Sequence, residues 1–207
     1  MNMNYIIKYK HMTDYNKHIV NIINSNISIK RAIIEDKNLI IAIEKAAVQI
    51  INCYNNGGKV LLCGNGGSAA DAQHIAAEFS GRFYFDRKSL AAEAIHVNTS
   101  YITAVANDYS FNDIYSRYID GCGKANDVLI AISTSGNSEN IIRAINTAKQ
   151  NKMFTIALTG LSGGKMKGIS DLIINVPSSD TPRIQESHIL IGHIICEIVE
   201  SNLFPKM

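Results

Sequence analysis

Four side chains in two distant segments have types and spacings that suit proton transfer or metal binding. His74 and Glu78 are four residues apart, which places an imidazole and a carboxylate on one helical face, one turn apart. Gln185 and His193 are eight residues apart, about two helical turns. If these segments pack together, they supply nitrogen and oxygen ligands for zinc or another first-row divalent ion. Taken singly, each residue also has a structural explanation, such as a core histidine or a solvated carboxylate.

Two of the histidines lie in the last apolar segment of the chain. His193 is surrounded in sequence by aliphatic residues, and burial of an unpartnered imidazole is unfavourable, so its position favours a functional role. His188 is interpreted as a core histidine. The last segment therefore contributes one functional imidazole to the predicted site.

A glycine-rich turn precedes the helix that carries His74. Glycines at 64, 66 and 67 allow close backbone approach to a ligand, and the N-terminus of the following helix favours an anion. The turn matches a loose dinucleotide fingerprint, but the next strand ends in Asn98 and Thr99 without the expected acidic residue. The GxxxxGK[ST] phosphate loop is absent as well. We therefore expect a sugar phosphate and no nucleotide cofactor.

Residues 133–138 carry four hydroxyls and an amide around one glycine, at a second junction between strand and helix. Such groups can donate to phosphate oxygens. Ser and Asn are also ordinary residues at a helix N-terminus, so any single hydroxyl has a structural alternative. Four together favour an oxyanion cradle.

The elements needed to position these groups follow from the apolar periodicity. Residues 14–34 and 36–54 are predicted helices, and a strand and helix alternation follows them. Such alternation indicates an α/β fold with a parallel sheet between helices, in which loops at the carboxyl ends of strands bind the ligand. Strands are expected at residues 59–63, 94–97, 127–132, 154–158 and 172–176, and further helices from 68, near 100–106, at 139–151 and at 182–202.

Composition limits the class of protein. Its 207 residues suit one domain, the charge of +2 is spread thinly, and no basic tract suggests nucleic acid. The four cysteines lack disulfide or zinc-finger spacing, and no segment is long and apolar enough for a leader or a membrane helix. We expect a cytoplasmic protein that binds neither nucleic acid nor membrane.

With these motifs the chain resembles the bacterial phosphoheptose isomerases of the sugar isomerase (SIS) fold, over nearly its full length. The resemblance implies conversion of sedoheptulose 7-phosphate to D-glycero-D-manno-heptose 7-phosphate, for lipopolysaccharide or capsule heptose. It also implies a homotetramer with active sites between subunits. Residues 1–13 extend beyond the usual start and are expected to be flexible, and residues 14–207 form one SIS domain that includes the two N-terminal helices.

The resemblance also assigns site residues. It implies that the zinc ligands are His74, Glu78, Gln185 and His193. It implies substrate contacts at Asn65, Gly66, Gly67, Ser68, Asp71, Glu78, Asn107, Asp108, Ser133, Thr134, Ser135, Ser138 and Gln185. Asp71 orients substrate or a ligand, or only complements the helix dipole.

The expected mechanism is aldose–ketose isomerisation through an enediol, with Glu78 as base and His193 as acid. Two alternatives stay open. One is a non-catalytic relative of the DnaA-binding replication regulators, which differ from this chain at Glu78 and His193. The other is a SIS protein that isomerises or senses another phosphosugar, such as a hexose or aminosugar phosphate. The loop at residues 177–182 departs from the common family sequence, which bears on specificity near the sugar tail and is compatible with a capsular rather than a core heptose.

Overall fold

The computed structural model describes the backbone of residues 3–205 and the side chains of residues 15–205. Its centre is a five-stranded parallel sheet with the strand order β2-β1-β3-β4-β5. Every residue of β1 and β3 is buried, as expected for strands covered on both faces. The strands are β1 Val60–Gly64, β2 Ala92–Ala94, β3 Val128–Ile132, β4 Phe154–Thr159 and β5 Leu172–Asn175.

Seven α-helices and two short 3₁₀ helices are assigned in the described part of the chain. The helices are α1 Met3–Glu35, α2 Lys37–Asn55, α3 Gly67–Ser80, α4 Thr99–Asp108, α5 Ile114–Cys122, α6 Glu139–Gln150 and α7 Thr181–Leu203, with η1 Phe111–Asp113 and η2 Gly164–Gly168. Asp36 separates the first two helices, and its Oδ1 accepts the backbone N–H groups of Asn38 and Leu39 at the start of α2.

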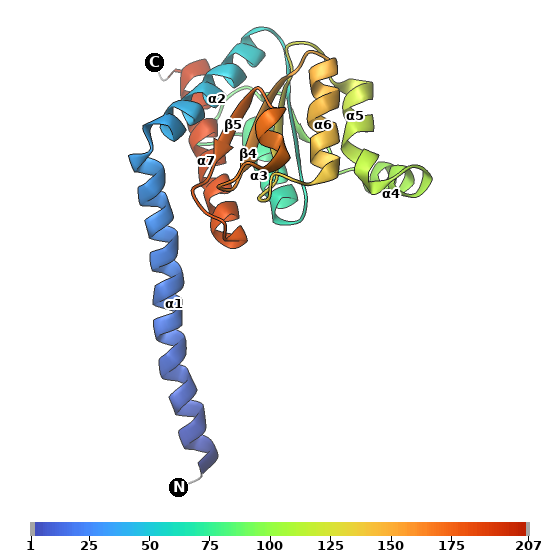
Figure 1. Ribbon diagram of the computed structural model, residues 1–207. Helices are drawn as coiled ribbons and strands as arrows, with labels where there is room; N and C mark the ends of the chain where they lie inside the picture. The colour runs from blue at the N-terminus through green and yellow to red at the C-terminus, as the bar shows by residue number, and fades with distance from the viewer. Residues whose placement is uncertain (1–2, 206–207) are drawn as a thin grey trace.

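Alternate residues of the strands face two separate hydrophobic cores. Leu62 and Ile130 face the core that α2, α3 and α7 cover, whereas Leu61 and Leu129 face the core that α5 and α6 cover. Figure 1 shows these helices on the two sides of the sheet. The predicted α/β fold, a parallel sheet between helices, is confirmed.

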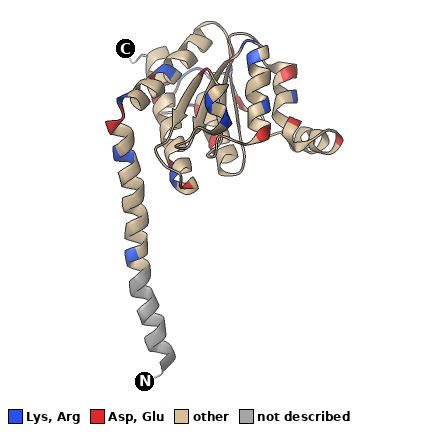
Figure 2. Cartoon of the chain, in the orientation of Figure 1, with Lys and Arg blue, Asp and Glu red and all other residues tan. Residues whose placement is uncertain are grey.

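The first helix extends away from these layers (Figure 1). Its described part carries few charged residues (Figure 2) and a series of exposed apolar side chains. These side chains are Tyr15, Ile19, Val20, Ile22, Ile23, Ile27 and Ile34. The predicted flexible extension at residues 1–13 lies outside the residues whose side chains are described. No helix in the described residues has the length and apolarity to cross a membrane.

Two predicted elements differ from the structure. The second strand was expected at residues 94–97, but the pairing with β1 runs from Ala92 to Ala94 and Ile95 lies beyond it. The apolar residues there belong to a turn, and its Ile95 is buried in the core under α5 and α6. A prediction from apolar residues alone therefore puts the strand at the wrong residues. Helix α5 was not predicted. Its buried Ile114, Tyr115 and Ile119 form one apolar face on only nine residues.

Candidate active site

The glycine turn after β1 requires glycine at two positions. A Cβ on Gly64 would lie 2.4 Å from the carbonyl oxygen of Ser68, and Gly66 has a φ of +57°, a left-handed conformation. The hydroxyl of Tyr115 donates to the Gly64 carbonyl at 2.5 Å. Gly66 lies at the start of α3 and has no side chain to cap the helix. The N-terminus of α3 can therefore bind an anionic ligand.

A pair of amides joins this turn to the start of α6, the helix that follows the hydroxyl loop. Asn65 Nδ2 donates to Asn140 Oδ1 and Asn140 Nδ2 donates to Asn65 Oδ1, each at 2.9 Å. Asn140 is buried in the first turn of α6, next to residues 133–138. The glycine turn is thus bonded to the first turn of α6, directly after the loop with which it is predicted to share one pocket.

Three of the four hydroxyls of the second loop lie close together. Ser133 Oγ lies 3.0 Å from Ser138 Oγ and 3.4 Å from Ser135 Oγ. Ser138 precedes α6 but makes no side-chain cap to it, so the explanation of this residue as an ordinary helix cap does not apply. The Thr134 carbonyl accepts the N–H of Gly160, which ties the loop to the end of β4.

Helices α3 and α7 run side by side and together carry the four predicted ligands. Near their starts, Gln185 Nε2 donates to Asp71 Oδ1 at 2.5 Å, and the Gln185 side chain lies against Gly67. Burial raises the pKa of Asp71 to about 6, even though Gln185 and the nearby His74 act to lower it. This bond fixes which way the Gln185 amide points.

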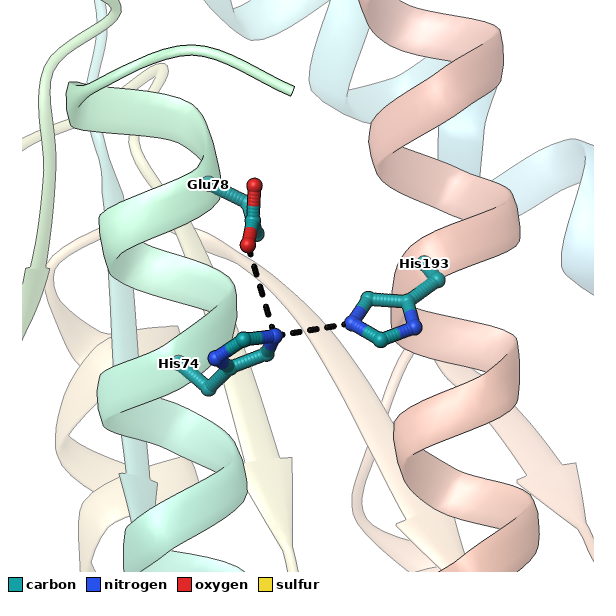
Figure 3. A group of neighbouring side chains, drawn as sticks. All are labelled: His74, Glu78 and His193. Atoms are coloured by element: carbon teal, nitrogen blue, oxygen red, sulfur yellow. Dashed lines mark hydrogen bonds and ion pairs between the residues drawn. The ribbon is translucent and has the colours of Figure 1, made fainter. Parts of the chain in front are cut away.

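Further along both helices, His74, Glu78 and His193 form one cluster (Figure 3). His74 Nε2 lies 2.9 Å from His193 Nε2 and 3.3 Å from Glu78 Oε1. One ligand atom of each residue lies within 4.8 Å of the others. Two imidazoles and a carboxylate at this spacing form a possible site for a divalent metal ion.

A glycine allows the two helices to approach at this point. Gly192 precedes His193, and a Cβ there would lie 2.5 Å from Cδ1 of Ile75 on α3. The side chain next in sequence to His74 therefore occupies the space that Gly192 leaves. The close approach of the helices puts the two imidazoles within bonding distance.

The remaining predicted residues have separate positions. Ser68 is buried in the first turn of α3. Asn107 and Asp108 are exposed at the end of α4, where Asn107 Nδ2 donates to Asp108 Oδ1 at 2.9 Å. His188 is fully buried, with Nε2 3.1 Å from the Thr159 carbonyl oxygen, which agrees with its interpretation as a core histidine.

The sequence reasoning missed Asn140 and Gly192. Each had a weak signal, because a buried amide in an apolar helix requires a partner and a glycine inside a helix often marks a close approach. Neither signal identifies the partner residue. Asn140 contacts Asn65 in the turn before α3, and Gly192 contacts Ile75 on α3, and both partners are far away in the sequence.

The chain is similar to known proteins in sequence and in fold. The sequence model of the SIS domain family matches residues 24–160. The chain is 51% identical over 195 residues to phosphoheptose isomerase 2 of Campylobacter jejuni, across 94% of this chain and 97% of that protein. It is also 51% identical to the phosphoheptose isomerase of Aneurinibacillus thermoaerophilus, over 91% and 96% of the two chains. The structure of phosphoheptose isomerase GmhA from Neisseria gonorrhoeae matches with a TM-score of 0.85 and 42% identity, over 90% of this chain and 99% of that chain.

Proposed function

Since this chain belongs to the phosphoheptose isomerases of the SIS-domain family, we propose that it converts sedoheptulose 7-phosphate to D-glycero-D-manno-heptose 7-phosphate. The reaction is an aldose–ketose isomerisation and would supply heptose for lipopolysaccharide or capsule. The observation that carries this proposal is the cluster of His74, Glu78 and His193, because His74 and Glu78 lie on α3, the helix that begins at the glycine turn. The cytoplasmic location expected from the sequence stays a prediction.

The arrangement along α3 suits a long sugar phosphate. His74 comes six residues after Ser68, which corresponds to about 9 Å along the helix axis. The hydroxyls of residues 133–138 and the glycine turn would bind the phosphate, and the carbonyl end would reach the cluster. Asn107 and Asp108, at the end of α4, are the further proposed substrate contacts.

Glu78 and His193 are the proposed catalytic residues. The Glu78 carboxylate would take a proton from one of the two carbons that exchange the carbonyl and return it to the other. His193 would exchange protons with the two oxygens, and its ring lies within hydrogen-bonding distance of His74. The side chain of Glu78 is 22% exposed, so a substrate can reach it.

Zinc is the proposed metal, with His74, Glu78, Gln185 and His193 as its ligands. The donor set supports this choice, because imidazole and carboxylate ligands suit zinc and other first-row divalent ions. A bound divalent ion would polarise the carbonyl and stabilise negative charge on oxygen. Asp71 supports the set by holding the Gln185 amide, which leaves the oxygen of that amide free for the ion.

A homotetramer with active sites between subunits is also proposed. Two features support self-association: the exposed apolar side chains of α1, and an apolar groove of about 570 Å³ between α1, α2 and α7. The groove is lined by Lys30, Ile33, Ile34, Ile40, Ile43, Glu44, Leu190, Ile194 and Ile198. Exposed apolar surface of this extent is typical of interaction sites. Light scattering should give a tetramer mass, and replacement of Ile23 and Ile27 by Lys should reduce it.

The activity is tested with purified protein and sedoheptulose 7-phosphate, with and without a chelator. We expect conversion that falls on metal removal and returns with zinc. If the metal-loaded protein converts a hexose or aminosugar phosphate and does not convert sedoheptulose 7-phosphate, the result favours an isomerase of another phosphosugar. If the protein binds the replication initiator DnaA and shows no turnover, the result favours a replication regulator.

A further inference from the structure

A buried ion pair ties α7 to the segment that follows α3. Arg87 Nε donates to Glu200 Oε1 at 2.9 Å, and the two side chains are 2% and 1% exposed. The same carboxylate accepts the backbone N–H groups of Phe83 at 2.9 Å and Tyr84 at 2.7 Å. Burial alone would raise the pKa of Glu200, but these hydrogen bonds and Arg87 outweigh it and lower the pKa. The pair is therefore charged and fully bonded.

Arg87 also closes the C-terminal end of α3. Its Nη2 donates to the carbonyl of Glu78 at 2.8 Å, and its Nη1 donates to the carbonyl of Phe79 at 2.8 Å and that of Gly81 at 3.2 Å. The last carbonyls of a helix have no partner within it, and the helix dipole favours a cation there. One of the carbonyls that Arg87 binds belongs to Glu78, the proposed base.

The other half of the pair lies on the helix that carries His193. Glu200 is seven residues further along α7, about two turns, and so lies on nearly the same face. The segment that Glu200 binds also contacts the site, because the Phe83 ring lies 5.7 Å from the His193 ring, centroid to centroid. A single pair thus contacts the backbone of Glu78 and fixes the helix of His193.

We propose that Arg87 and Glu200 are positioning residues that set the distance between Glu78 and His193, and with it the metal affinity and turnover of the site. The turnover part rests on the proposed isomerase activity, whereas the metal part rests only on the proposed metal site. Asp71 and Gln185 join the same two helices near their starts. The cluster lies between these two connections.

The test uses Arg87→Lys and Glu200→Gln in the full-length chain. Lys keeps the charge but cannot bond Glu200 and three carbonyls at once, because it lacks the planar fork of Arg. Gln keeps the shape of Glu200 and removes its charge. Zinc affinity is measured by competition with a chromogenic chelator, the geometry of the site by the absorption spectrum of bound Co²⁺, and kcat and KM with sedoheptulose 7-phosphate.

Asp127→Asn is the matched control. The Asp127 carboxylate is also buried, and it accepts two backbone N–H groups, from Lys59 and Lys124, and the ammonium of Lys59 at 2.6 Å. Its partners lie in the segments before β1 and β3, outside α3 and α7. This variant loses the same kind of bond without loosening the two helices of the site.

We expect Arg87→Lys and Glu200→Gln to bind zinc about 10- to 100-fold more weakly than the unmodified chain, with a changed Co²⁺ spectrum. Turnover should fall by a similar factor, with KM changed less than about threefold, since the loss lies in the reacting geometry. The proposal is overturned if zinc affinity and spectrum stay at the unmodified values, or if Asp127→Asn weakens zinc equally. If Glu200→Gln does not fold, Arg87→Lys and Glu200→Asp carry the test. An unmodified chain that binds zinc but does not convert the substrate refutes the proposed function, and the zinc measurements still decide the role of the pair.

Discussion

The Nε2 atoms of His74 and His193 lie 2.9 Å apart, although 119 positions separate the two residues in the chain. Two imidazole nitrogens at this distance can form a hydrogen bond or bind one ion between them. Because an imidazole binds a metal ion only in its neutral form, we expect metal binding at this pair to weaken as the pH falls.

Replacement of His193 by Gln should weaken zinc binding by more than about 100-fold, beyond the loss typical of a residue that only supports a ligand. Glu78→Gln should lower kcat by about 10²- to 10⁴-fold, the usual contribution of a general base. Glu139→Gln serves as the control, because Glu139 is an exposed helical glutamate on α6. Chelator competition and steady-state kinetics check these values. Near-normal turnover of a folded Glu78→Gln protein would contradict the assignment of the base.

Gly192→Ala should destabilise the protein by about 1–3 kcal/mol, because the new methyl group overlaps Cδ1 and Cγ1 of Ile75. Removal of those atoms by Ile75→Ala should relieve the overlap, so the double variant should lose less than the sum of the single losses. Urea unfolding of the four proteins measures this coupling. Gly121→Ala on α5 is the control, since a Cβ there meets nothing within 4 Å, and it should not lower stability. Additive losses at positions 75 and 192 would contradict the close approach.

Asn140→Ala should raise KM for the sugar phosphate, because it frees Asn65 and separates the two loops proposed to bind the phosphate. The unpartnered amide of Asn65 should also lower stability by about 1–3 kcal/mol. Asn151→Ala at the other end of α6 is the comparison, since Asn151 bonds the carbonyls of Ile119 and Gly123. That variant should lose stability with an unchanged KM. Equal KM values in both variants would argue against a shared pocket.

His188 should make the protein less stable in acid. Burial lowers its pKa from 6.5 to about 4, and nearby Lys30 acts in the same direction, while the bond to the Thr159 carbonyl opposes them. The unfolded chain then binds the proton more readily than the folded chain, so stability rises with pH between about 4 and 6.5. Over that window the contribution is about 3 kcal/mol, lost as the pH falls.

Urea unfolding between pH 4 and 7.5 tests this at constant protein concentration, with a chelator present so that metal release does not contribute. His188→Gln keeps a donor for the Thr159 carbonyl and removes the titration. Its stability should change less with pH than that of the unmodified chain. Parallel pH curves for the two proteins would contradict the assigned role of His188.

Much of the fold follows from the sequence, because the buried parallel strands are continuous apolar runs and the helices between them have clear apolar faces. The exceptions are local. Helix α5 is too short to give a clear periodic signal, and β2 has only three paired residues at the edge of the sheet. In both places the tertiary contacts of Ile95 and Tyr115 decide the structure.

The residue types of the site could be predicted from the sequence, but the residues that hold them in position could not. The spacing of His74 and Glu78 indicates a ligand pair, but no local pattern connects Asn65 to Asn140 or Arg87 to Glu200. These partners are polar residues far apart in the chain, and each is ordinary in its own segment. Only the packing of α3 against α7 and of one loop against the next reveals which of them meet.

Helix α7 contacts the α3 region through Gln185, His193 and Glu200, at intervals of eight and seven residues. Because each residue turns a helix by about 100°, one inserted or deleted residue between these points would rotate everything after it to another face. Asp71, His74 and the Phe83 segment could not then be reached together. The helix can therefore exchange side chains over evolution far more readily than it can change length, and single-residue insertions between positions 185 and 200 should be selected against.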